Sequence, residues 1–386
     1  MAVLSGWIAS AAGVQRGRLT LGARIERIEL DGTPVPAPTD DASIILPGFV
    51  DVHVHGGAGG DTMDGPDGVR TMARHHLTHG TTTLLPTTLT QPWADVLAAL
   101  DGVIEVRREA AAGADRDSGG LPEIPGAHLE GPFVSPDRLG AQPPFAIPPD
   151  ADRVAEVLAR DVVRIVTMAP ELEGAEAAAR TFAAAGVRVS LGHTTAGAAT
   201  VARIAHAGRG DGGTLGFTHL YNAMGGLAGR APGVVGACLA DPDAYAELIL
   251  DGHHVDPVAF LAAYAAKGDR LLLITDAIRA CGLPDGETVV AEQPVTVTDG
   301  AARLADGTLA GSVLTLDAAL RNAVAAGIPL VRASHLASGA PAGYLGLNDR
   351  GRIEPGLRAD VVELSSDLHV QRVFVAGREA AGPLEG

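Results

Sequence analysis

Eight short apolar runs with the character of β-strands, separated by helix-patterned segments, fill the middle of this 386-residue chain. The runs are Phe49–His55, Thr82–Thr88, Ile124–Glu130, Val163–Ala169, Val187–His193, Leu215–Tyr221, Ala246–Asp251 and Leu271–Asp276. Alanine-rich segments with helical spacing lie between most of them, at Trp93–Arg108, Ala175–Ala185, Ala196–Ala207 and Pro257–Ala266. This alternation predicts an α/β fold of the (β/α)8 barrel type. An open, doubly wound sheet is the rival, but its phosphate fingerprint G-x-G-x-x-G after a first strand is not evident.

The two ends of the chain show a different pattern from the middle. Short β segments joined by turns run from Val3 to Ile44, and the same pattern returns from Gly351 to Gly377. Such an arrangement predicts that the termini meet in one small domain. We therefore expect a small β-sandwich domain of residues 1–46 and 351–386 beside a barrel domain of residues 47–350. The polar stretch Glu109–Gly120 is expected to be a surface loop of the barrel.

Composition argues against several classes of protein. The formal net charge is −17 and no basic face is apparent, which disfavours nucleic-acid binding. No apolar run is long enough to predict a membrane span, and the first twelve residues lack the features of a secretory signal. Two cysteines, Cys238 and Cys281, cannot form a disulfide framework, so a cytoplasmic location is expected.

Barrels of this type carry their chemistry at the C-terminal ends of the strands. The first run ends with His53 and His55, and alternate side chains on a strand share one face. Two imidazoles on one face are good ligands for zinc or a similar divalent ion. Two histidines packed in a polar core are the alternative, which their position at a strand end before a double glycine disfavours.

Three further runs end in a residue able to bind a metal ion. The third ends at Glu130, where a Gly-Pro pair stops the strand, and a carboxylate there can bind one ion or bridge two. The fifth ends with His193, and the sixth has His219 near its end, two residues before Tyr221. His128 has the parity of Glu130 but lies deeper, so we expect a structural role for it.

The eighth run ends at Asp276. An acidic residue directly after a buried apolar strand is costly unless it has a partner or a task. Beside a metal-bound water that task would be general base. Most of the remaining histidines lie on helix-like or terminal β segments and are interpreted as structural, namely His75, His76, His79, His206, His335 and His369.

Seven motifs, in order over nearly the whole chain, resemble the amidohydrolase superfamily and more closely the N-acetylglucosamine-6-phosphate deacetylases. They are PGFVDVHVHG from Pro47, HLEGPF from His128, GHTTA from Gly192, THLYNAM from Thr218, DGHH from Asp251, TDA from Thr275 and GTLAGS from Gly307. The combination is far more specific than any single motif.

The resemblance implies a role for each matching residue. Glu130, His193 and His219 would hold the catalytic metal, and Asp276 would be the general acid/base. His53 and His55 would hold a second ion, as in those members that keep this pair. The implied substrate contacts are Asn222, the backbone of Ala223, Arg230 and His254, with Ala141, Gln142, Leu309, Ala310 and Gly311 bordering the substrate.

The expected cofactor is one or two divalent ions per subunit, with zinc first and iron, manganese or cobalt as alternatives that suit the same ligands. The resemblance also implies a homodimer. Dihydroorotase- and hydantoinase-like members commonly use a carboxylated lysine as the metal bridge. The single lysine here, Lys267, precedes the eighth run instead of ending a strand, so Glu130 is expected to take that place.

Two residues depart from the family pattern. Gln142 stands where the family usually has a histidine, and Arg279 follows the TDA motif where a small apolar residue is more usual.

The hydrolytic residues are all present, so we predict hydrolysis of the acetamide of N-acetyl-D-glucosamine 6-phosphate to D-glucosamine 6-phosphate and acetate. Two alternatives stay open. One is deacetylation of N-acetylgalactosamine 6-phosphate or a nonphosphorylated sugar, and the other is a noncatalytic sugar-phosphate sensor.

Overall fold

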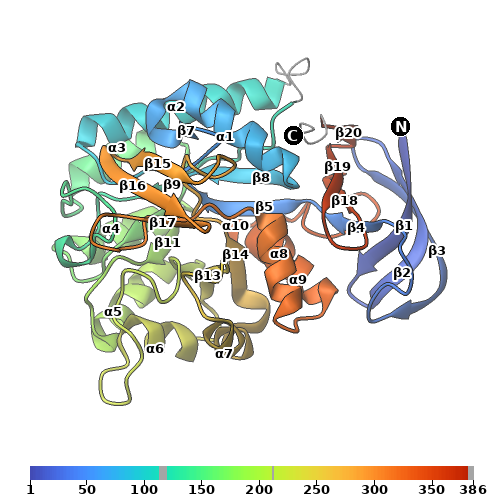
Figure 1. Ribbon diagram of the computed structural model, residues 1–386. Coiled ribbons are helices and arrows are strands. Elements are labelled where there is room, and N and C mark those ends of the chain that lie inside the picture. The colour runs from blue at the N-terminus through green and yellow to red at the C-terminus, as the bar shows by residue number, and fades with distance from the viewer. Residues whose placement is uncertain (113–119, 211–212, 381–386) are drawn as a thin grey trace.

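The computed structural model describes residues 1–112, 120–210 and 213–380, which form a barrel with a smaller β structure beside it (Figure 1). All eight predicted runs are strands, and they are β5 (Phe49–Val54), β8 (Thr81–Pro86), β9 (Ala127–Glu130), β10 (Val163–Met168), β11 (Arg188–Leu191), β12 (Leu215–Phe217), β13 (Tyr245–Ile249) and β14 (Leu271–Ile274). Their side chains are almost all buried, as expected for parallel strands with both faces covered. The predicted fold class is confirmed.

The barrel closes through two seams. Strands β9 to β14 form one parallel sheet in sequence order, and β5 pairs in parallel with β8. Thr87 and His128 form a parallel bridge that joins β8 to β9. At the other seam the Asp276 N–H donates to the His53 carbonyl at 2.9 Å, which joins β14 to β5. The second seam therefore joins two residues of the predicted site, His53 and Asp276.

Helices cover the outside of the barrel. They are α1 (Pro66–Thr78), α2 (Trp93–Ala112), α3 (Ala151–Ala159), α4 (Ala175–Ala184), α5 (Ala198–Arg209), α6 (Gly233–Ala240), α7 (Pro257–Lys267), α8 (Leu316–Ala325), α9 (Leu330–Ala337) and α10 (Gly339–Leu345). The Asp256 carboxylate caps α7 by accepting from the Val258 N–H, and Pro257 takes the first turn, where no N–H is needed. Helix α2 continues to Ala112, so the first part of the predicted Glu109–Gly120 loop is helical, and residues 113–119 lie outside the described residues.

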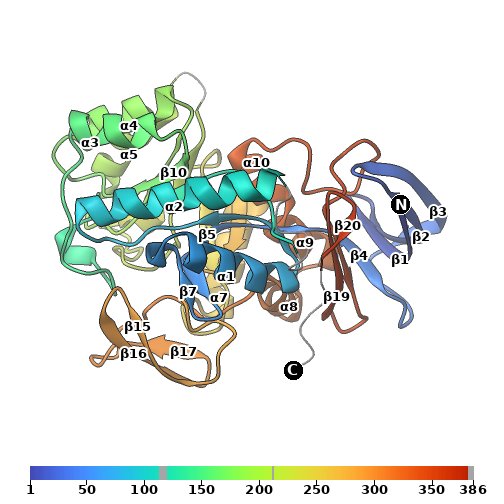
Figure 2. The ribbon, with the colours of Figure 1, turned by 90° about the horizontal axis from the view of Figure 1, so that it is seen from above.

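Both ends of the chain contribute to one small sheet, as predicted. Its strand order is β20-β19-β18-β4-β1-β2-β3, with β1 (Ala2–Ser10), β2 (Gly13–Leu21), β3 (Ile25–Val35), β4 (Ile44–Pro47), β18 (Val361–Leu364), β19 (Val370–Val375) and β20 (Arg378–Glu379). Ile25 on β3 and Phe374 on β19 share one apolar core although their strands lie near opposite ends of this order. The sheet therefore bends over on itself, and its two layers enclose that core (Figure 2). The domain limits at residues 46 and 351 stay a prediction.

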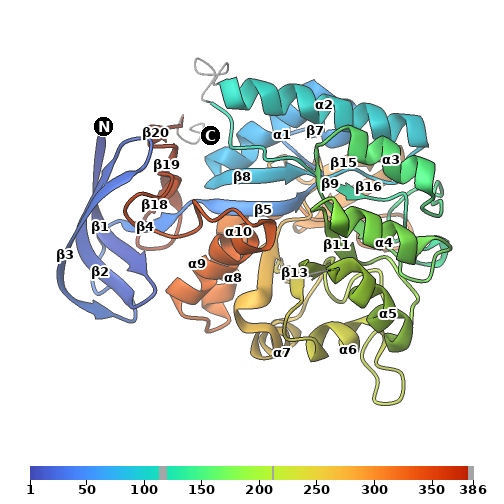
Figure 3. The ribbon, with the colours of Figure 1, turned by 180° about the vertical axis from the view of Figure 1, so that it is seen from behind.

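The small sheet is packed against the barrel by its second apolar face. Trp7, Leu46 and Val362 belong to the same apolar core as the barrel strands. Strand β4 leads directly into β5, the first barrel strand (Figure 3). No helix in the described part of the chain is both long and apolar enough to cross a membrane.

A second, three-stranded sheet was not predicted. It is formed by β15 (Gly286–Val290), β16 (Gln293–Thr298) and β17 (Ala301–Arg303), between β14 and α8. Its inner residue Val290 packs with Leu89, Ile278 and Ala310 in a core of its own. The remaining short elements are β6 (Gly56–Gly57), β7 (Gly60–Asp61), η1 (Thr62–Asp64), η3 (Pro136–Arg138) and η4 (Gly268–Arg270).

Candidate metal centre and active site

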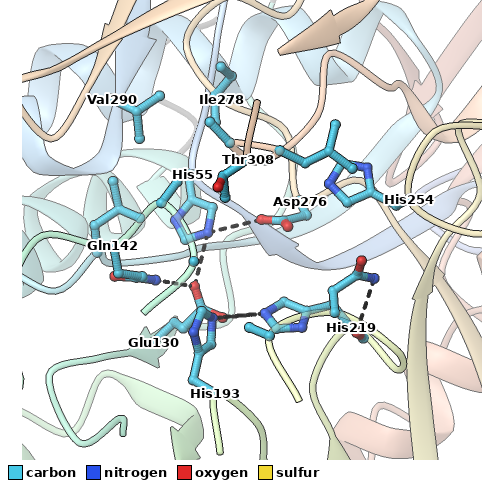
Figure 4. Close-up of a pocket in the computed structure, with 18 residues that line it drawn as sticks. His55, Glu130, Gln142, His193, His219, His254, Asp276, Ile278, Val290 and Thr308 are labelled. Carbon is cyan, nitrogen blue, oxygen red and sulfur yellow. Dashed lines mark hydrogen bonds and ion pairs between the residues drawn. The ribbon is translucent and has the colours of Figure 1, made fainter. Parts of the chain in front are cut away.

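Glu130 lies at the centre of the predicted ligands, at the end of β9 (Figure 4). Its Oε1 is 3.0 Å from His219 Nε2 and 3.3 Å from His193 Nε2. Its Oε2 is 3.2 Å from His55 Nε2, and His53 Nε2 is 3.5 Å from Oε1. The five predicted metal ligands therefore converge, and one carboxylate lies between two pairs of histidines.

The ends of the strands turn these side chains inward. His193, His219 and Asp276 each have a positive φ, at 46°, 29° and 49°. Residues with a side chain rarely adopt this left-handed region, which costs on the order of 1–3 kcal/mol each and persists only where the surrounding structure imposes it. The strain at three strand ends indicates that their side chains are held for a function and not only for packing.

Hydrogen bonds orient three of the four imidazoles. The Nδ1 atoms of His53, His55 and His193 lie 2.9, 3.2 and 2.8 Å from Glu247 Oε2, the Thr87 carbonyl and the Arg138 carbonyl. Carboxylates and carbonyls only accept, so each Nδ1 carries the proton and each Nε2 presents its lone pair to the centre. This arrangement is typical of metal-binding histidines.

The charges at the centre fit a divalent cation. Burial disfavours protonation of His55, but the carboxylates of Asp276 and Glu130 outweigh it and raise the His55 pKa to about 9. Burial opposes ionisation of Asp276, but His53 and His55 lower its pKa to about 2. Buried carboxylates thus draw positive charge onto the imidazoles, and a divalent ion would supply that charge and displace the protons. His53, His55 and Glu130 form one candidate ligand set, and Glu130, His193 and His219 form another.

Asp276 lies beside both sets and faces the pocket. Its Oδ1 is 3.1 Å from His55 Nε2 and 3.5 Å from His53 Nε2. The backbone next to it is crowded, because a Cβ on Gly311 would lie 2.9 Å from the Asp276 carbonyl, and Gly311 has a φ of +63°. Only glycine fits there comfortably. Because its pKa is lowered, Asp276 is an ionised carboxylate, and it lies next to the metal ligands, as a general base requires.

A cavity of about 240 Å³ opens above the metal ligands. Eight of the nine predicted substrate contacts line it, namely Ala141, Gln142, Asn222, Ala223, His254, Leu309, Ala310 and Gly311. The sequence interpretation did not select Leu89, Gly140, Ile278, Val290 and Thr308, which line it as well. Val290 lies on the unpredicted sheet, which thus closes one side of the cavity.

The ninth predicted contact, Arg230, does not line the cavity. Its side chain is exposed in the loop between β12 and α6. Arg279 is also not among the lining residues, because its guanidinium pairs with Asp64 at 2.8 Å. The departure from the family pattern at Arg279 therefore lies outside the lining of the cavity.

Gln142 supports the central carboxylate. Its Oε1 accepts from the Thr90 N–H at 2.5 Å, which directs its amide group into the site. The Gln142 Nε2 then donates to Glu130 Oε2 at 2.7 Å. The Gln142 side chain thus holds the oxygen of Glu130 that faces His55.

The structure also shows the contacts of the remaining residues that the sequence analysis singled out, His128, Lys267 and His254. His128 bonds the Val52 carbonyl at 2.9 Å and Thr167 Oγ1 at 2.7 Å, as its expected structural role requires. Lys267 donates to the Cys238 carbonyl at 3.1 Å, away from the metal ligands. His254 is oriented by Asp251 Oδ2, 2.7 Å from its Nδ1, and lines the cavity.

The chain is similar to known proteins over nearly its whole length. Residues 44–380 match the model of the amidohydrolase family. The N-acetylgalactosamine-6-phosphate deacetylase of Escherichia coli O157:H7 is 40% identical over 359 residues, which cover 91% of this chain and 92% of that protein. The N-acetylglucosamine-6-phosphate deacetylase of Bacillus subtilis (strain 168) is 37% identical over 375 residues, which cover 95% and 92%.

Solved structures extend the similarity to the fold. N-acetyl-D-glucosamine-6-phosphate deacetylase from Mycobacterium smegmatis superposes with a TM-score of 0.87 at 34% identity, over 99% of this chain and 100% of that one. A variant of that enzyme in complex with N-acetyl-D-glucosamine-6-phosphate gives a TM-score of 0.86 at 34% identity, over 98% of both chains.

Proposed function

The chain belongs to the amidohydrolase family, and we propose that it is the deacetylase that converts N-acetyl-D-glucosamine 6-phosphate to D-glucosamine 6-phosphate and acetate. The observation that carries this proposal is the convergence of Glu130, His193 and His219 beside an ionised Asp276 at the base of a pocket. A noncatalytic sensor would need none of these groups together, so the arrangement favours an enzyme.

The chemistry follows from the positions of the side chains. Glu130, His193 and His219 would hold a divalent ion, which when bound would lower the pKa of a water molecule and polarise the acetamide carbonyl. Asp276 takes the proton of the attacking water and returns it to the amine that leaves. Exclusion of bulk water from the buried site strengthens these electrostatic effects.

The sugar phosphate is expected to lie in the cavity above the metal ligands. We assign its contacts to Asn222, the backbone of Ala223 and His254, whose ring is already oriented by Asp251. The loop around Ala141 and Gln142 and the Leu309–Gly311 segment border the sugar. Arg230 stays a predicted phosphate ligand, although its guanidinium lies outside the cavity lining.

The proposal also covers the metal ions, the oligomeric state and the location in the cell. Zinc is our first choice of metal, with iron, manganese or cobalt as alternatives that suit imidazole and carboxylate ligands. Because His53 and His55 are both present and directed at Glu130, we propose that two ions bind. We also propose a homodimer and a cytoplasmic location, as the sequence predicts.

N-acetylgalactosamine 6-phosphate is a second candidate substrate. The observation in its favour is the 40% identity to a relative from Escherichia coli O157:H7 that deacetylates this epimer. The two sugars differ only in the configuration of one hydroxyl group, so the same metal ligands and base would serve both reactions.

One assay separates these possibilities. Amine release by the zinc-supplemented protein is measured with N-acetylglucosamine 6-phosphate, N-acetylgalactosamine 6-phosphate and free N-acetylglucosamine. We expect the highest kcat/KM for the glucosamine phosphate and little turnover of the free sugar. A higher value for the galactosamine epimer would change the substrate, and no amine release from any of the three would reject the deacetylase.

A further inference from the structure

Glu247 lies inside the barrel next to His53, on strand β13, and its side chain is buried. Its Oε2 is 2.9 Å from His53 Nδ1. Because an ionised carboxylate can only accept a hydrogen bond, Nδ1 carries the ring proton and Nε2 keeps its lone pair for a metal ion. Glu247 thus fixes both the orientation and the tautomer of His53.

The same carboxylate oxygen also contacts the other ligand set. Glu247 Oε2 accepts from the backbone N–H of His219 at 3.4 Å. His219 has a φ of +29°, and its Nε2 is 3.0 Å from Glu130 Oε1. One carboxylate therefore touches the side chain of a ligand in one set and the backbone of a ligand in the other.

The surroundings of Glu247 do not balance its charge. Among the residues that the structure describes, its Oε1 has no hydrogen-bond partner, and its ion pair is with His53 alone. A buried carboxylate with a single imidazole partner is destabilising unless more positive charge lies near. Metal ions bound by His53 and His219 would supply that charge. The carboxylate is thus better explained by the metal centre than by the stability of the barrel.

We infer that Glu247 is a positioning residue that holds His53 for one ion and steadies the His219 backbone at the other. The inference rests on the two-ion centre proposed above. Partners that orient a metal-binding histidine typically change metal affinity by about 10- to 100-fold when they are replaced. The ion bound through His53 should be affected most, because there the contact is to the ring itself.

The test uses Glu247→Gln, which keeps the shape of the side chain and removes its charge. Zinc affinity is measured on the metal-depleted, full-length protein by competition with a chromophoric chelator, and the absorption spectrum of bound Co²⁺ is recorded. We expect the zinc step that is lost in His53→Ala to fall by about 10- to 100-fold in affinity and the Co²⁺ spectrum to change. Unchanged affinities together with an unchanged spectrum would overturn the inference.

Two controls distinguish positioning from a general effect on the fold. Glu363→Gln neutralises another buried carboxylate, which pairs with Arg372 at 3.3 Å in the small terminal sheet, and should leave zinc binding unchanged. In a His53→Ala background, Glu247→Gln should change zinc affinity far less than in the wild type. An equal loss in both backgrounds would contradict a role through His53. A wild-type protein that binds no zinc would instead reject the metal centre itself.

Discussion

The candidate site has a floor and a rim that the chain holds in different ways. The floor consists of the metal ligands and the base, which lie at strand ends and are at most 8% exposed, namely His53, His55, Glu130, His193, His219 and Asp276. The rim includes Asn222, His254 and Thr308, which lie on loops and are partly exposed. The strands fix the atoms that react, whereas the loops surround the rest of the substrate. Changes in the floor should therefore abolish the reaction, and changes in the rim should alter which substrate is used.

Removal of the metal is expected to have the largest effect, because every part of the floor is arranged around it. Treatment with a strong chelator should abolish amine release, and zinc should restore it. The metal-free protein should also unfold at a lower temperature, since an ion at 100 times its Kd stabilises the fold by about 2.7 kcal/mol. Scanning calorimetry with and without zinc measures this shift. Full activity after the metal content falls to zero would contradict the proposed floor.

Asp276→Asn should have the next largest effect. An amide cannot take the proton of the attacking water, and a general base typically contributes about 10²- to 10⁴-fold to the rate. We expect kcat to fall by that order while zinc content, measured by elemental analysis, stays that of the wild type. Wild-type kcat in the variant would assign the base to another residue.

His254→Ala tests the rim. Asp251 accepts from Nδ1 of the His254 ring and holds it at the edge of the cavity, where Nε2 can donate to a phosphate oxygen when the ring is an imidazolium. Loss of a hydrogen bond to a charged group costs about 1.5–3 kcal/mol, or roughly 10- to 150-fold. That loss should appear in kcat/KM for the phosphorylated sugar and should be nearly absent for the free sugar. An equal loss for both sugars would place His254 with the floor.

Arg230→Ala is a weaker test of the rim, because the Arg230 guanidinium does not line the cavity. If the residue binds phosphate, the preference for phosphorylated over free sugar should fall, by less than in His254→Ala. Kinetics with both sugars measure this ratio. An unchanged ratio would show that the resemblance assigned Arg230 a role that it does not have in this chain.

The floor could be predicted from the sequence because its residues lie at or near the C-terminal ends of the barrel strands. Alternate residues on a strand share a face, so His53 and His55 had to point the same way, and the barrel brings all strand ends to one side. Glu130 and His193 end their runs and His219 lies near the end of its run, and the structure brings the three within 3.3 Å of one another.

The residues of the rim, and Glu247, which contacts the metal ligands of the floor, were harder to predict. Val290 reaches the cavity from a short antiparallel sheet whose position depends on contacts far along the chain, such as that with Leu89. Glu247 was missed because it lies within a strand and not at its end. An acidic residue inside an apolar strand is costly without a partner, and that signal could have identified it.

Arg279→Ala should have the smallest effect on catalysis. It tests whether the rim ends at the residues that line the cavity. Arg279 pairs with Asp64 at 2.8 Å on a partly exposed surface and does not line the cavity. A partly exposed ion pair contributes about 0–1 kcal/mol. The guanidinium also lies 3.9 Å from the buried Asp61 carboxylate, so the free energy of unfolding should fall by somewhat more than that. The kcat and KM for each sugar should equal those of the wild type. A changed preference between the two epimers would show that the segment after Asp276 selects the substrate, and the rim would then extend beyond the residues that line the cavity.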